Sequence, residues 1–214
     1  MQKEIIEKAL IFVKETFEND FSGHDYFHTL RVFKMATNIA RAENAKLEIV
    51  QLSALLHDVD DFKLSPQTCE NKDNARSFLA RNGVKEEIIC EICNIISEVS
   101  YLGSDSVVPK TLEGKCVQDA DRLDAIGAIG VARAFAYGGN HNRLMYHPEI
   151  KPKLNMNKEE YLNSKSTTVN HFYEKLFKLE DMMNTQSAKN IAKARNDYMK
   201  DFISRFLNEW EGIE

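Results

Sequence analysis

The stretch at residues 85–100, KEEIICEICNIISEVS, indicates the fold class most clearly, because its apolar residues recur with the spacing of an α-helix. Spacings of three and four residues place the aliphatic side chains on one helical face. These side chains are Ile88, Ile89, Ile92, Ile95, Ile96 and Val99. The pattern predicts an amphipathic helix that buries its apolar face against other elements of the fold.

The same periodicity continues on both sides of this stretch. Gly83, just before it, stands where a left-handed C-cap would close the preceding helix. No alternating strand of useful length occurs, and 9 Gly and 4 Pro are too few for a sandwich or barrel with many turns. The sequence therefore predicts an all-α fold. We expect helices over residues 3–18, 25–42, 47–58, 72–82, 85–100, 112–137, 159–182 and 186–209.

The length and composition favour one domain. A chain of 214 residues that is 43% hydrophobic can bury a sizeable core. The segment at about 138–157, GGNHNRLMYHPEIKPKLNMN, is rich in Asn, Gly and Pro and predicts a long loop. Because the flanking helices each lack an independent core, we expect a functional loop within a single domain, residues 1–214.

Charge and cysteine usage exclude several classes of protein. The 28 basic and 33 acidic residues leave a net charge of −5, which argues against a general nucleic-acid-binding protein. No stretch approaches the roughly 18 apolar residues of a membrane span, and the N-terminus does not resemble a signal peptide. Cys69, Cys90, Cys93 and Cys116 show no second paired motif, so we expect packed, reduced thiols and a cytoplasmic protein.

Four polar residues fall on predicted apolar faces: His28, His57, Asp58 and Asp121. In the helix predicted over 112–137, the carboxylate aligns with Val117, Ala125, Ala128 and Ala132. A lone histidine on such a face is usually a hydrogen-bonded core residue. Two histidines and two carboxylates together are harder to explain, because a buried carboxylate is costly without a cation. Such a set suits one divalent ion, Mn, Fe, Co, Ni or Zn, with Mg as a further candidate.

The spacing of these residues resembles the H…HD…D signature of the HD-domain metal-dependent phosphohydrolase superfamily. The local contexts agree: HDYFHTLRVF around His28, ALLHDVDD around His57 and Asp58, and VQDADRLDAIGAIGVARAF around Asp121. Together with TTVNHFYEKLFKLEDMMNT, they look like a subgroup of small bacterial HD hydrolases. The resemblance implies an HD-domain helical bundle, with these four residues as metal ligands.

The resemblance also implies a catalytic residue. Asp61 stands where some HD nucleotidases have an acidic residue that orients or deprotonates water. If the helix predicted over 47–58 continues for one more turn, Asp61 lies four residues after His57 and close to a metal-bound water. The alternative is that Asp60 and Asp61 are solvated residues at a helix end, although anions are disfavoured there.

Water activated by a divalent ion would attack a phosphoryl group, and cationic side chains would help to neutralise the charge on the phosphate. Arg143 in the long loop and Lys175 are candidates, and His171 shares a helical face with Lys175. A solvated surface charge is the competing interpretation for each cation. We expect a small phosphorylated substrate, a nucleotide, cleaved as a phosphomonoester or at a pyrophosphate bond.

Three other functions remain open. A non-catalytic protein could keep the pocket and bind metal and nucleotide for regulation. A dinuclear oxygenase would need further nitrogen ligands, but residues 72–100 contain no histidine. A purely structural bundle would have to bury four polar side chains without a cation. The exposed faces of the last two helices are compatible with a homodimer.

Overall fold

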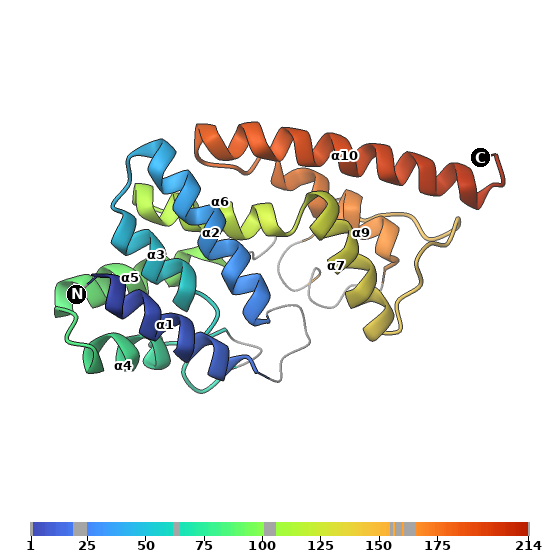
Figure 1. Cartoon of the computed structure of the whole chain (residues 1–214). Helices are drawn as coiled ribbons and strands as arrows, with labels where there is room; N and C mark the ends of the chain where they lie inside the picture. The colour runs from blue at the N-terminus through green and yellow to red at the C-terminus, as the bar shows by residue number, and fades with distance from the viewer. Residues whose placement is uncertain are drawn as a thin grey trace. The chain divides into compact units, whose positions relative to one another are not determined.

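A computed structural model describes residues 2–18, 25–61, 65–100, 106–154, 156, 160 and 166–213 (Figure 1). Within these ranges every regular element is a helix, and the predicted all-α class is confirmed. The elements, in chain order, are α1 (Gln2–Thr16), α2 (Tyr26–Glu43), α3 (Leu47–Leu56), α4 (Asp73–Arg81), α5 (Glu86–Val99), α6 (Leu112–Asp124), α7 (Gly127–Asn140), α9 (Thr168–Glu174), the 3-10 helix η2 (Leu176–Leu179) and α10 (Gln186–Trp210).

The chain divides into two compact units. The first comprises Met1–Ser100 and Val107–Asp121, and the second comprises Tyr101–Ser106 and Arg122–Glu214. The boundary falls within α6, so this helix contributes residues to both units. A single domain over residues 1–214 stays a prediction.

The first unit is built around α3, which contacts α1, α2 and α5 (Figure 1). Its sequence, LEIVQLSALL, is apolar on nearly every side, and such a helix is stable only where it is surrounded. Val50, Ala54, Leu55 and Leu56 have no exposed surface. Because α3 ends in the middle of this core, the residues that follow it start from a buried position.

The helix predicted over 112–137 is interrupted, and that prediction was wrong. α6 ends at Asp124 and α7 begins at Gly127, whose φ of +77° breaks the helical path. A side chain at Gly130 would collide with the carbonyl of Ala125, so this glycine allows the turn to pack closely. After the break, Ala128 and Ala132 are exposed rather than aligned with Asp121.

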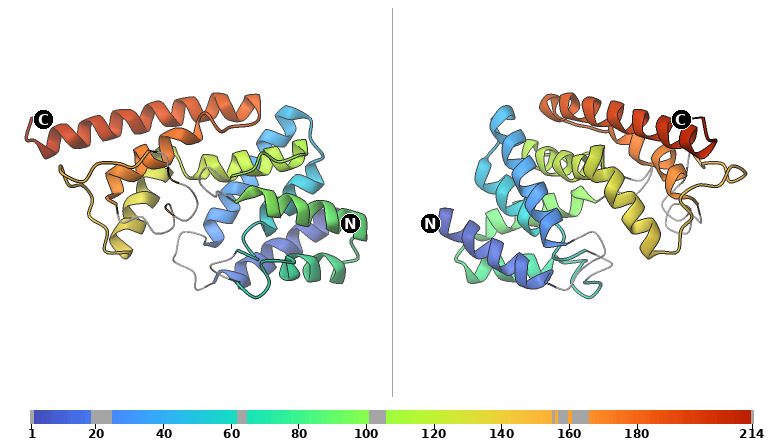
Figure 2. Two further views of the ribbon diagram at one scale, coloured as in Figure 1. Left: turned by 180° about the vertical axis from the view of Figure 1, so that it is seen from behind. Right: turned by 45° about the vertical axis from the view of Figure 1, so that its right-hand side comes forward.

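The second unit contains α7, α9, η2 and α10, and α10 contacts both α7 and η2 (Figure 2). Aromatic rings fill its interior: Phe135 lies 5.9 Å from Phe202 and 6.2 Å from Phe172, measured between ring centroids. The helix predicted over 159–182 is wrong in length, because α9 starts at Thr168 and gives way to η2. Much of its predicted first half lies outside the described residues.

The long loop is partly confirmed. α7 continues to Asn140, and the described residues 141–154 form no helix. The backbone N–H groups of Thr168 and Val169 donate to the carbonyls of Leu144 and Met145, both at 2.9 Å. The Asn170 amide donates to the carbonyl of Ile150 at 2.8 Å. The loop is therefore held along the start of α9.

Two further expectations can be compared with the structure. No helix in the described part of the chain has the length and apolar character needed to cross a membrane. All four cysteines are free thiols, as expected from their spacing. Burial raises the pKa of the Cys116 thiol to about 12, which makes this thiol unreactive.

Candidate metal centre

Helices α2, α3 and α6 position the four predicted ligands. His28 lies in the first turn of α2, where Asp25 caps the helix by accepting the His28 backbone N–H at 2.6 Å. His57 is the C-cap of α3, and Asp58 follows it in a turn. Asp121 lies in the last turn of α6. Each ligand therefore stands near a helix end.

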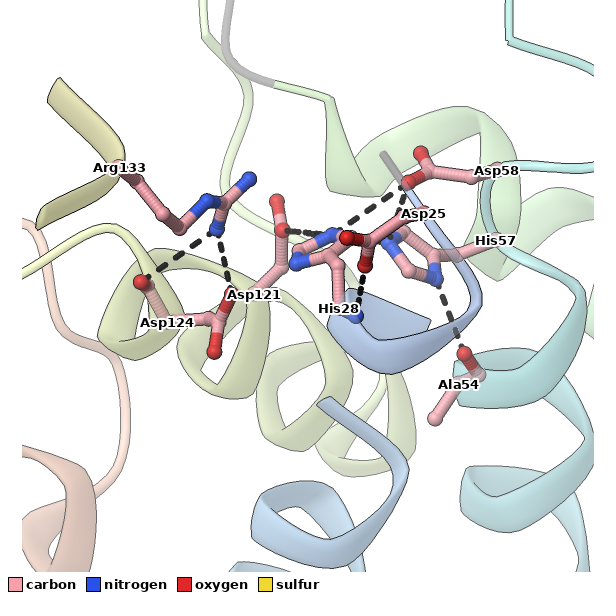
Figure 3. A network of polar contacts seen from close by, with 8 residues as sticks. All are labelled: Asp25, His28, Ala54, His57, Asp58, Asp121, Asp124 and Arg133. Atoms are coloured by element: carbon pink, nitrogen blue, oxygen red, sulfur yellow. Dashed lines mark hydrogen bonds and ion pairs between the residues drawn. The ribbon is translucent and has the colours of Figure 1, made fainter. Parts of the chain in front are cut away.

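The structure brings these four side chains together (Figure 3). Nε2 of His28 is 3.4 Å from Oδ2 of Asp58 and 3.4 Å from Oδ1 of Asp121. Nε2 of His57 is 3.2 Å and 3.9 Å from the same two oxygens. One ligand atom each from His28, His57 and Asp58 lies within 4.8 Å of the others, so these three buried residues could hold a metal ion.

The tautomer of His57 fits metal binding. Its Nδ1 is 2.9 Å from the carbonyl oxygen of Ala54, which can only accept, so Nδ1 carries a proton. In the neutral ring the lone pair then lies on Nε2, which is buried and makes no hydrogen bond within the described structure. This lone pair faces carboxylate oxygens, an arrangement that is repulsive unless a cation lies between them. A carbonyl that fixes the ring in this way is typical of metal-binding histidines.

The same carboxylates shift the titration of the centre. Burial disfavours the charged imidazolium of His57, but the nearby charges of Asp58 and Asp121 outweigh it and raise the pKa of His57 above 6.5. Burial likewise opposes ionisation of Asp121, and the two histidines overcome it and lower the pKa of Asp121 below 3.8. The site therefore favours positive charge between its carboxylates, supplied by a proton or by a metal ion.

The helical premise for Asp61 was wrong. α3 ends at Leu56, and the next four residues form a turn in which the Asp61 N–H donates to the carbonyl of Asp58 at 3.0 Å. The turn removes the helical geometry between His57 and Asp61 on which that argument rested. The catalytic role of Asp61 stays a prediction.

The alternative of a solvated Asp60 was also wrong, and here the sequence reasoning missed a structural residue. Asp60 is 1% exposed, and its carboxylate accepts the backbone N–H groups of Asn74 and Ala75 at 3.1 and 2.9 Å. These groups open α4, whose N-cap residue, Lys72, supplies no side-chain cap. The sequence signal was the absence of a capping side chain at Lys72, which leaves the N–H groups at the start of α4 in need of a distant acceptor.

The predicted phosphate-binding cations belong to the second unit. The charges of Lys175 and Arg143, together with burial, lower the pKa of His171 to about 3. Burial is the largest cause of this shift, and the positive charges of the two cations add to it. The Arg143 guanidinium also lies 5.7 Å from the centre of the Tyr137 ring. Both predicted cations therefore influence the titration of the same buried histidine.

Comparison with known proteins connects these residues to a family. The model of the HD domain matches residues 25–126, a range that includes all four predicted ligands. The chain is 34% identical to the uncharacterized protein YpgQ of Bacillus subtilis, over 97% of this chain and 95% of that protein.

Two solved structures are similar over nearly their whole length. An HD-superfamily hydrolase from Bacillus thuringiensis is 43% identical, with a TM-score of 0.79 and 99% of each chain covered. YpgQ in complex with ADP is 33% identical, with a TM-score of 0.77, covering 98% of this chain and 100% of that one.

Proposed function

Because this chain belongs to the HD domain superfamily, we propose that it is a metal-dependent phosphohydrolase that acts on a small phosphorylated molecule, a nucleotide. The observation that carries the proposal is the buried Nε2 of His57, whose lone pair faces the carboxylates of Asp58 and Asp121. His28, His57, Asp58 and Asp121 would hold one divalent ion. Mn, Co, Fe, Ni, Zn and Mg are all candidates.

A divalent ion at this position would supply a water of lowered pKa and would neutralise charge on a phosphoryl oxygen. The residues of the chain prepare the site. Asp25 and Ala54 fix the backbone of His28 and the ring of His57, so that both imidazoles meet the carboxylates with little freedom. Asp61 would accept a proton from the attacking water. This carboxylate is partly exposed, so it can pass the proton on to solvent.

The choice of a nucleotide rests on two supports. YpgQ was crystallised with ADP, and its similarity covers nearly the whole of both chains. Arg143 and Lys175 in turn provide positive charge for a phosphate, and the pKa of the nearby His171 is lowered to about 3 by burial and by these two charges. Full-length similarity also supports the proposal of one functional domain, residues 1–214, with its loop at about 138–157.

A hydrolysis screen tests the proposal. The purified protein, loaded in turn with Mn²⁺, Co²⁺, Zn²⁺ or Mg²⁺, should release phosphate or pyrophosphate from nucleotides, and His57→Ala should abolish the release. The exposed His141 offers a matched control, and His141→Ala should retain activity. Full activity in Asp58→Ala would show that the centre is assigned wrongly. Metal-dependent nucleotide binding without turnover would favour the alternative, a non-catalytic regulatory protein.

A further inference from the structure

The end of α6 carries an unusual amount of buried charge. Asp124, its last residue, is 5% exposed, and its Oδ2 accepts from Nη1 of Arg133 at 2.5 Å. The same nitrogen lies 3.4 Å from the main-chain oxygen of Asp124 (Figure 3). Arg195, from α10, donates to the carbonyl of Leu123 at 2.5 Å. Two arginines from later helices therefore hold the last two residues of α6.

This arrangement compensates for an unfavourable sequence. The C-terminus of a helix carries partial negative charge and unpaired carbonyl groups, so an aspartate there is destabilising by itself. Arg133 neutralises the carboxylate, and Arg195 supplies a second donor to the carbonyl of Leu123, which also accepts the backbone N–H of Ile126 at 3.2 Å. Burial lowers the pKa of Arg195, and the charge of Asp124 opposes this shift, so the second guanidinium lies within the field of the same carboxylate.

The chain also makes room for the second arginine. A Cβ at Gly127 would lie 2.9 Å from Cγ of Arg195, closer than atoms of this kind approach. The glycine that breaks the helical path therefore also admits the side chain that caps α6. The end of α6 is thus held by four residues: Asp124, Gly127, Arg133 and Arg195.

Asp121 lies three residues before Asp124, in the last turn of the same helix. Its Oδ1 is 3.4 Å from Nε2 of His28, and metal ligands must hold their distances within about 0.2 Å. Helix ends fray unless their polar groups are satisfied. We propose that the Asp124–Arg133 pair is a positioning device for the metal centre, which holds Asp121 in place by closing the last turn of α6. This inference rests on the proposed function.

A pair that acts by positioning Asp121 should change the affinity of the centre for its metal ion. We expect Asp124→Asn and Arg133→Met to weaken Mn²⁺ binding roughly ten- to a hundredfold, the usual cost of losing a group that orients a metal ligand. Arg133→Lys keeps the charge and should retain most of the affinity. Mn²⁺ electron paramagnetic resonance measures the free ion directly and requires no turnover.

Two controls separate positioning from stability. Arg205→Met removes an exposed pair of the same type, Arg205–Asp201 on α10, and should leave Mn²⁺ affinity unchanged. Leu179→Ala should lower the melting temperature through a cavity in the core of the second unit, yet leave Mn²⁺ affinity unchanged. If Asp124→Asn does not fold, the comparison of Arg133→Met with Arg133→Lys decides the question.

The outcomes are distinct. Wild-type affinity in both Asp124→Asn and Arg133→Met would overturn the inference, as would an equal loss of affinity in Leu179→Ala, because the pair would then act only on stability. A wild-type protein that binds none of the divalent ions would contradict the proposed function itself. A wild-type protein that binds Mn²⁺ without hydrolysing nucleotides would contradict the hydrolase and leave the positioning test intact.

Discussion

Protons and a metal ion should compete for His57. Its Nε2 lies 3.2 Å from Asp58 and 3.9 Å from Asp121, and these carboxylates raise the pKa of His57 above 6.5 although burial opposes the charge. Only the neutral imidazole can bind a metal ion. Below the raised pKa, each pH unit should therefore cost a factor of about ten in apparent affinity, about 1.4 kcal/mol. Between about pH 6.5 and about pH 5.5 the affinity for Mn²⁺ should fall several-fold, up to about tenfold.

The same competition should appear in the stability of the protein: as the pH rises, the stabilisation from protonated His57 decreases and the stabilisation from bound Mn²⁺ increases. Because the folded pKa of His57 is raised, its protonation stabilises the metal-free fold fully below 6.5, and this contribution is lost as the pH rises through the folded value. Stabilisation by Mn²⁺ should grow over the same range. The increase in melting temperature on adding Mn²⁺ should thus be larger at about pH 8 than at about pH 6.

Isothermal titration calorimetry with Mn²⁺ at several pH values measures the slope directly. His141→Gln, which changes an exposed histidine, should keep the wild-type slope, and His57→Gln should lose most of the affinity at every pH. An affinity for Mn²⁺ that does not change across this range would refute the reasoning, because no proton would then leave the site when the ion binds.

Three further predictions concern stability, each measured by urea unfolding. Asp60→Ala should cost about 1–3 kcal/mol, because two backbone N–H groups that open α4 lose their acceptor. Gly127→Ala should cost about 1–2 kcal/mol or more from its φ of +77° and its contact with Arg195, whereas Gly139→Ala, which meets nothing within 4 Å, should be neutral or stabilising. Wild-type stability should fall as the pH drops from 6.5 toward about 3, because His171 stays neutral in the fold but is protonated in the unfolded chain. His171→Gln should remove up to about 2 kcal/mol of this loss at about pH 5, and an unchanged acid sensitivity in the variant would contradict it.

The sequence by itself determined the fold class and the family of this protein. Both depend on local information: a helical repeat of apolar residues, and a signature of four residues, His28, His57, Asp58 and Asp121, each within a recognisable local context. Periodicity reports only which side of a helix turns inward, and the expectation that these four residues would meet inside the fold came from the resemblance to the HD family.

Only the tertiary structure decided where the helices end and which distant side chains bind the polar groups at those ends. Nothing in the apolar pattern from 112 to 137 shows the break at Gly127, because alanines and valines keep the same spacing across it. Asp60 caps a helix 14 residues away, and Arg195 reaches a carbonyl 72 residues away. Such pairs form because a buried polar group must find a partner somewhere in the fold, and local sequence does not specify which distant residue will provide it.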